Sequence, residues 1–350
     1  MAYTTVNKAT DYFNTKLYTG NGGTNAITGV GFQPDMIWCK ARGYNDDHTI
    51  TDAVRGNTKV VYPNNGNAEA TSSSRITAFG TDGFTLGSSG DVNSNNSTYA
   101  AWNWKAGTGQ GSSNTDGSIN TTYTSVNTTA RFSISKYTGT GSNATFGHGL
   151  GVIPDMVIVK NLSGTDSWMV YHRGVNSNID AEDYILQFNT NITGTNNNTV
   201  WNDTAPTSSV VSIGTDGGVN SNGSNYIAYC FASKPGYSRF GRYIGNADTN
   251  GSYVYTGFKP AFVLIKDASS VASWGMFDNK RDPDNIVEHT LFTNSNTSED
   301  NSTDRMDILS NGFKHKSSDN FSNKLNANFI YMAFAEEPLV GSNNIPATAR

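Results

Sequence analysis

The chain has 350 residues, of which 36% are hydrophobic, 11% aromatic and only 15% charged, and its formal net charge is −5. The aromatic content indicates folded cores. The negative charge, without a basic stripe, argues against nucleic-acid binding. No apolar stretch is long enough for a transmembrane helix, and residues 1–10 do not resemble a secretory signal. Cys39 and Cys230 lie in separate apolar runs, as expected of free, buried thiols in a protein made in the cytoplasm.

In chain order, one pattern of elements occurs three times. A short strand ends in Tyr-x-Gly, and a Gly-x-x-Pro turn then leads into four apolar residues that end at a lysine. The prolines are Pro34, Pro154 and Pro260, and the lysines, each six residues later, are Lys40, Lys160 and Lys266. Proline is tolerated where a strand begins, and a continuous apolar run is typical of a strand buried on both faces. The repeat length of roughly one hundred residues suits a small domain.

The middle of each repeat carries a bulky ring and then an arginine. Trp168 and Trp274 lie eight residues after their lysines, and His48 holds this position in the first repeat. The arginines are Arg55, Arg173 and Arg281. Asp-Gly and Asn-Gly turns follow, which favour hairpins. Each repeat closes on an aromatic strand, at 99–104, 226–231 and 329–334. We assign 181–188 to a strand and predict no amphipathic helix longer than two turns.

The sequence therefore predicts an all-β protein of three tandem antiparallel β-sandwich domains of the jelly-roll type. The divisions are an N-terminal docking segment (1–11), a first sandwich (12–107), a linker (108–130), a second sandwich (131–235), a third sandwich (236–338) and a C-terminal tail (339–350). Residues 123–126 of the linker are a candidate for an additional strand. The long linker predicts more freedom between the first two domains than between the last two.

No motif predicts catalysis, a cofactor or a bound metal. Glu336 and Glu337 are adjacent, so on a strand they point to opposite faces instead of forming a hydrolytic pair. Asp35 and Asp155 follow the turn proline in two repeats, which predicts that they cap the turn or pair with Arg55 or Arg173. The lone histidines His148 and His172 favour hydrogen-bonded structural roles. The runs 91–95 and 278–285 place oxygen ligands at alternate positions, as Ca²⁺ sites do, but solvated loops are the favoured interpretation.

Three aromatic residues are candidates for stacking on sugar rings, because they lie near loops rich in Asn, Asp and Arg. They are Trp168, Tyr171 and Trp274. The favoured alternative is that they fill the sandwich cores, since large aromatic side chains dominate core energetics.

Segments 127–134, 137–145, 147–151 and 154–160, together with the tail 334–350, resemble a module of tailed-phage virion proteins, especially those of marine phages. The resemblance covers nearly the whole chain. It implies jelly-roll domains, a place in the virion and a structural or fibre-like role. The chain departs from the pattern at Ala261, where the other repeats have aspartate, and at His48, where they have tryptophan.

The expected function is that of a non-enzymatic virion protein, a tail or head fibre or other appendage that contacts a host surface glycan. The expected partners are other virion proteins and further copies of the chain in a symmetric oligomer such as a trimer, with no nucleic acid and no membrane insertion. The first alternative is a decoration protein that stabilises the capsid shell. A polysaccharide depolymerase is a third, less favoured interpretation.

Overall fold

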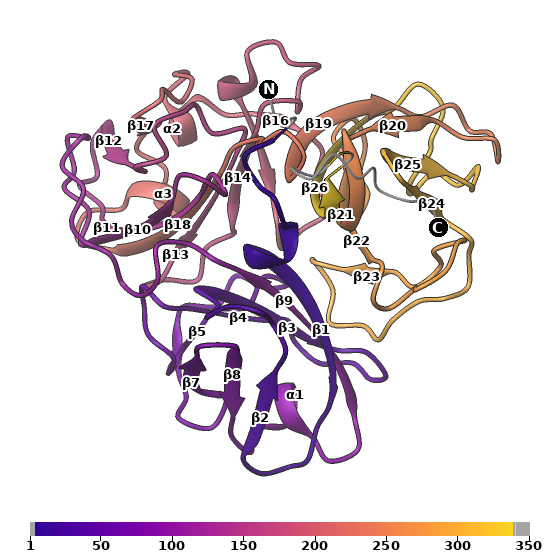
Figure 1. The fold of residues 1–350 in the computed structure, drawn as a ribbon. Helices are drawn as coiled ribbons and strands as arrows, with labels where there is room; N and C mark the ends of the chain where they lie inside the picture. Colours follow the sequence, from indigo (N-terminus) through magenta and orange to yellow (C-terminus); the bar gives the residue numbers. More distant parts are fainter. Residues whose placement is uncertain (1–3, 339, 341–350) are drawn as a thin grey trace.

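The structure, a computed structural model, describes residues 4–338 and 340 and is all-β, as predicted. Residues 1–3 of the predicted docking segment, and the predicted tail except residue 340, lie outside the described residues. Figure 1 shows three lobes around a common centre: indigo to purple for the first repeat, magenta to pink for the second and orange to yellow for the third. None of the short helices in the described part of the chain has the length and apolar character needed to cross a membrane.

Each repeat contributes one large sheet in which its first and last strands are antiparallel neighbours. The first repeat has the order β1 (Phe13–Thr19), β9 (Thr98–Trp104), β3 (Met36–Ala41) and β4 (Thr49–Asp52). The second has β10 (Tyr123–Asn127), β11 (Phe132–Thr138), β18 (Asn225–Phe231), β13 (Met156–Asn161), β14 (Met169–His172), β15 (Tyr184–Gln187) and β16 (Thr195–Asn196). The third has β19 (Ser238–Ile244), β26 (Asn328–Pro338), β21 (Phe258–Asp267), β22 (Trp274–Asp278) and β23 (Leu291–Phe292).

A smaller sheet completes each sandwich, and in it the second strand of the repeat pairs with a late one, as in a jelly roll. These sheets are β2 (Asn25–Thr28), β8 (Gly83–Leu86) and β7 (Ile76–Gly80); β12 (Ala144–Gly147) and β17 (Val210–Ile213); and β20 (Tyr253–Tyr255), β25 (Gly312–His315) and β24 (Met306–Leu309). A further hairpin joins β5 (Lys59–Val60) and β6 (Ala70–Thr71). The helices are η1 (Ala9–Asp11), α1 (Gly90–Asn93), η2 (Ala181–Asp183), α2 (Asn198–Trp201) and α3 (Gly217–Asn220). The segment assigned to strand at 181–188 thus begins with a 3-10 turn.

The central strands are buried on both faces, as the continuous apolar runs predict. Every residue of β3 and of β13 is buried. Successive side chains of a strand point to opposite faces. In β3, Met36 and Trp38 belong to a cluster that extends through all three repeats, whereas Ile37 and Cys39 pack with the small sheet of the first repeat. Each large sheet therefore serves its own sandwich on one face and a shared centre on the other.

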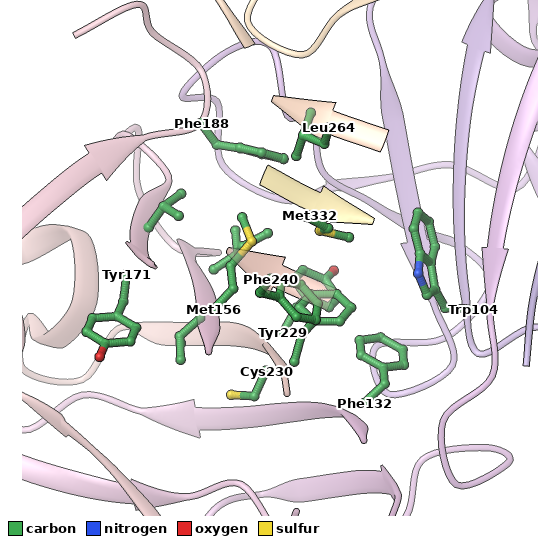
Figure 2. Close-up of a cluster of buried hydrophobic side chains, with 14 of the residues drawn as sticks. Trp104, Phe132, Met156, Tyr171, Phe188, Tyr229, Cys230, Phe240, Leu264 and Met332 are labelled. Atoms are coloured by element: carbon green, nitrogen blue, oxygen red, sulfur yellow. The ribbon is translucent and has the colours of Figure 1, made fainter. Parts of the chain in front are cut away.

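The shared centre is aromatic and draws on every repeat. Figure 2 shows Trp104 of the first repeat, Phe132 and Tyr229 of the second and Met332 of the third in the same cluster. Phe188 of the second repeat lies with its ring centroid 5.5 Å from that of Trp38 and 5.0 Å from that of Trp274. One hydrophobic core thus holds together segments that are hundreds of residues apart in the sequence.

Hydrogen bonds between the repeats run in one direction around this centre and close a ring. Trp168 Nε1 donates to Tyr62 O of the first repeat at 3.0 Å. Trp274 Nε1 donates to Gln187 O of the second repeat at 2.9 Å. In the first repeat the position belongs to His48, whose Nε2 contacts Phe292 O of the third repeat at 3.0 Å. Three acceptors at corresponding places in three repeats give the chain a pseudo-threefold arrangement.

This ring overturns the expectation of a flexible joint between the first two repeats. The start of the linker is fixed by Asp35, whose carboxylate accepts hydrogen bonds from the backbone N–H groups of Ala106, Thr108 and Gly109 at 2.7, 3.0 and 2.8 Å. Its end supplies β10, which confirms the candidate strand at 123–126. The repeats share one core because their large sheets have apolar residues on both faces.

The repeated lysines have one structural role. Lys40, Lys160 and Lys266 are fully buried, and each Nζ donates to the carbonyl of the next residue, at 2.5–2.7 Å, and of the residue four positions on, at 3.2–3.4 Å. Burial lowers the pKa of each ammonium group to about 8. These lysines therefore close the turn that follows the central strand of each repeat.

We expect acetic anhydride to acetylate exposed lysines of the folded protein, such as Lys8 and Lys280, more than about tenfold faster than these three, because a buried Nζ reacts only after local opening. Peptide mass spectrometry of the folded and the urea-unfolded protein measures the difference. Equal labelling of all lysines in the folded protein would contradict the buried placement.

Candidate functional site: an arginine-lined cleft

The three aromatic candidates for sugar stacking are buried, so they do not form a glycan surface. Trp168, Trp274 and Tyr171 are 0%, 1% and 5% exposed. The indole N–H groups of both tryptophans are used in the ring of hydrogen bonds between repeats. All three belong to the hydrophobic core, in agreement with the favoured interpretation, and residues of a neighbouring repeat accept the hydrogen bonds of the two indoles.

The repeated arginines do not occupy one equivalent position. Arg55 and Arg281 each lie fifteen residues after their lysine and are buried in ion pairs with Asp52 and Asp278, both at 2.5 Å. Arg173 lies thirteen residues after its lysine, and its side chain is 56% exposed. The difference of two residues was visible in the sequence and separates a surface arginine from two core arginines.

The other predicted structural residues lie as follows. Pro34 and Pro154 precede β3 and β13, whereas Pro260 lies inside β21 where the pairing with β26 is irregular. Proline has no N–H for the ladder, so it requires such an irregularity. Asp155 pairs with Arg173 at 2.8 Å, which is the ion pair that the sequence offered as an alternative to capping the turn. Asp35 instead caps the linker.

The two runs considered for Ca²⁺ are not simple solvated loops. Asp278 and Arg281 of the run 278–285 are a buried ion pair, and Asp91 of the run 91–95 pairs with Arg75. Farther along the run 278–285, Asp282 lies near Glu288 and His289, with ligand atoms within 4.8 Å of one another. Both carboxylate oxygens of Asp282 already accept hydrogen bonds from His289, at 2.5 and 3.0 Å.

The candidate site is a cleft of about 530 Å³ between the second and third repeats, and four arginines line it. Arg131 lies in the turn between β10 and β11, Arg173 follows β14, and Arg239 and Arg242 lie on β19. Phe240 and Tyr331 contribute aromatic walls, and Asn178, Ser233, Ser238 and Thr256 contribute polar groups. β19 is the edge strand of the third sheet, and Arg239 and Arg242, which start from opposite faces of it, both line the cleft at this edge.

Local contacts hold the cleft arginines in place. Arg242 Nε donates to Asn328 Oδ1 at 2.6 Å, and the Asn328 amide donates to Gly174 O at 2.9 Å, which connects the two repeats. Arg131 donates through Nη1 to Ser233 O. Arg239 is exposed and lies over the ring of Tyr255, 5.9 Å from its centroid. A guanidinium held in this way is pre-oriented for an oxyanion.

Gly241 permits the close packing at the floor of the cleft. A side chain there would place its Cβ 2.8–2.9 Å from atoms of the Tyr331 phenol ring. Burial raises the pKa of Tyr331, and the charge and hydrogen bond of Arg239 oppose that rise. The phenol thus lies against the positive side of the cleft as a neutral hydrogen-bonding group.

The cleft escaped the sequence analysis because its arginines come from separate segments and form no basic stripe. A second missed feature is the alternation in β20, where Tyr253 and Tyr255 are 47% and 44% exposed on either side of the buried Val254. This alternation is the signal that the sequence offered, since period-two patterns indicate an outward-facing aromatic pair.

A family profile described as "Domain of unknown function (DUF7483)" matches residues 8–338. The chain belongs to the DUF7483 family. The match covers all three repeats as one domain, which agrees with the core that they share and the closed ring of hydrogen bonds. No curated protein and no solved structure matches the chain. The DUF7483 match carries no activity with it, so function has to be argued from the site.

Proposed function

We propose that this protein is a non-enzymatic component of a tailed-phage virion, a tail or head fibre or other appendage, and that the arginine-lined cleft contacts a glycan on the host surface. The observation that carries the binding role is the cleft itself, which combines guanidinium, amide, hydroxyl and aromatic groups at one opening. Such a mixture suits a ligand rich in hydroxyl groups. The virion setting rests on the resemblance of the repeated segments.

The acids that the sequence singled out support a binding role over hydrolysis. Asp35 accepts three backbone hydrogen bonds, and Asp278 is fully buried beside Arg281. Asp155 pairs with Arg173 and accepts a hydrogen bond from the Ser233 N–H at 2.6 Å. A hydrolytic acid needs access to substrate and an unoccupied oxygen, and these three carboxylates have structural partners instead.

The test of the proposed function is the position of the chain in the intact particle, determined by cryo-electron microscopy, together with binding of the purified, fluorescently labelled protein to host cells. We expect a few copies projecting from the tail or a vertex, and cell binding that is lost after the surface polysaccharide is removed. Binding that survives this removal, or a chain absent from the particle, would contradict the proposal.

Capsid decoration is the second candidate, and one observation favours it. The pseudo-threefold ring gives the chain three similar lobes around one centre, a shape that fits a local threefold position of a shell. Hundreds of copies lying on the capsid faces would support this candidate and exclude the attachment role.

A further inference from the structure

We propose that the cleft selects acidic sugars: an oxyanion carried on a saccharide, a uronic acid carboxylate or a sulfate ester, binds the guanidinium groups while the sugar ring packs on Tyr255. This inference rests on the proposed glycan contact and deepens it by naming the class of ligand. It depends on charge, on the geometry of β19 and β20, and on the hollow that adjoins the cleft.

The charge in the cleft is unbalanced. Arg173 pairs with Asp155, but among residues 4–338 and 340 no carboxylate lies within ion-pair distance of Arg131, Arg239 or Arg242. Burial lowers the pKa of the neighbouring Lys234, and the charge of Arg131 lowers it further. Like charges gathered at one opening in a chain of net charge −5 repel one another unless an anion binds between them.

The geometry places an aromatic face beside the exposed guanidinium. The guanidinium carbon of Arg239 lies over the ring of Tyr255, and Thr256, the next residue, lines the cleft. Tyr253 lies two residues before Tyr255 and is exposed like it, so β20 offers two exposed phenol rings, of which that of Tyr255 lies beside Arg239. The apolar C–H face of a sugar packs on such rings, whereas a free inorganic anion has no apolar surface that could pack on them.

The adjoining hollow supplies acceptors for hydroxyl groups. It shares Arg173 and Asn178 with the cleft and is lined further by Asp155, Asp180 and Glu182. Carboxylates accept hydrogen bonds from sugar hydroxyls and repel a second anionic group. A saccharide that spans both hollows therefore places its acidic residue at the arginines of the cleft and an uncharged residue beside Asp180 and Glu182.

The experiment measures binding of three hexasaccharides to the full chain by isothermal titration calorimetry at physiological ionic strength: one of uronic acid residues, one of uncharged glucose, and the glucose hexasaccharide bearing sulfate esters. Inorganic phosphate alone is the fourth probe. We expect one or both acidic hexasaccharides to bind at least about tenfold more tightly than the uncharged one. Which of the two binds more tightly distinguishes carboxylate from sulfate.

Variants assign the binding to the cleft. We expect Arg239→Gln to weaken acidic saccharide binding by about tenfold or more and Tyr255→Ala to weaken saccharide binding without changing that of phosphate. Lys280→Gln removes the same charge from an exposed position elsewhere and should change affinity less than about twofold.

Equal affinity for charged and uncharged saccharides, phosphate binding as tight as that of the saccharides, or equal effects of Arg239→Gln and Lys280→Gln would overturn the inference. Host-cell binding that persists without a preference for acidic sugars would leave the attachment role standing while excluding this ligand class.

Discussion

Replacement of Arg281 by methionine is expected to lower the free energy of unfolding by about 3–5 kcal/mol, because it leaves a buried carboxylate without its counter-charge. Arg281 contacts Asp278 at 2.5 Å and Glu299 at 2.8 Å, and Trp102 of the first repeat donates to Asp278 at 3.1 Å. Burial raises the pKa of Asp278, but the charge and hydrogen bonds of Arg281 outweigh burial and hold that pKa below its ordinary value. The variant therefore weakens the third repeat and its interface with the first.

Urea-induced unfolding followed by tryptophan fluorescence measures this loss. Arg173→Met is the matched control, because the same change at a 56% exposed side chain should alter stability by at most about 1 kcal/mol. The double variant Asp278→Leu with Arg281→Met should lose less than Arg281→Met alone, since an apolar pair leaves no buried charge. A loss for Arg281→Met no larger than that of the control would show that the buried pair is not stabilised as its geometry implies.

The second repeat already carries a version without this ion pair. His172 lies opposite Met156 in the sheet as Asp278 lies opposite Phe262, and Val175 and Arg281 each follow three residues later. The two repeats with an Asp–Arg pair and the one with His and Val solve the same packing problem with different chemistry. A buried ion pair is thus one of two arrangements that this interface accepts.

The strands were predictable from the sequence because their signals are local. The run after each turn proline, the lysine six residues later and the closing aromatic strand all lie within one repeat, and the structure places β3, β13 and β21 there. The buried thiols Cys39 and Cys230 were predictable for the same reason. A continuous apolar run indicates that both faces of a strand are buried, but it does not say what covers each face.

The shared core and the cleft depend on contacts between repeats, which no local pattern records. Trp38 has the same sequence environment whether its ring packs inside its own sandwich or against Phe188 of the next repeat. Arg131 and Arg239 are more than one hundred residues apart in the sequence and line one opening. Trp168 and Trp274 lie in the hydrophobic core, in agreement with the favoured interpretation, but their indole N–H groups donate to residues of a neighbouring repeat, which no local pattern predicts.

Acidification from pH 7.5 to pH 5 is expected to lower the free energy of unfolding by about 2 kcal/mol for each of His172 and His315. Burial lowers the pKa of His172 to about 4 and that of His315 to about 3. The unfolded chain binds these protons near pH 6.5, so between pH 6.5 and about 4 it holds more protons than the folded chain. The free energy of unfolding therefore decreases as the pH is lowered through this range. Burial also lowers the pKa of His48 well below its ordinary value, which adds to the effect.

Beyond burial, the hydrogen bonds of Nδ1 in His172 and His48 also oppose protonation in the folded chain. Nδ1 of His172 accepts from the Gly174 N–H at 3.0 Å while Nε2 donates to Tyr331 O. Nδ1 of His48 likewise accepts from Trp38 Nε1 at 2.9 Å. A proton on either Nδ1 would face the N–H group that now donates to that nitrogen, and the hydrogen bond would be lost. Acid therefore acts on the contacts that His172 and His48 make with the third repeat.

Urea unfolding at pH 7.5, 6 and 5 measures the slope, and His315→Phe isolates one contribution. The ring of His315 stacks on Tyr243 with centroids 4.6 Å apart, and among the described residues neither of its nitrogens has a hydrogen-bond partner, so phenylalanine keeps the stacking and loses no hydrogen bond. We expect this variant to be about 2 kcal/mol less sensitive to the change from pH 7.5 to pH 5 than the parent chain. A slope that His315→Phe leaves unchanged would mean that His315 takes up its proton without unfolding, and the acid sensitivity would then have to arise elsewhere in the chain.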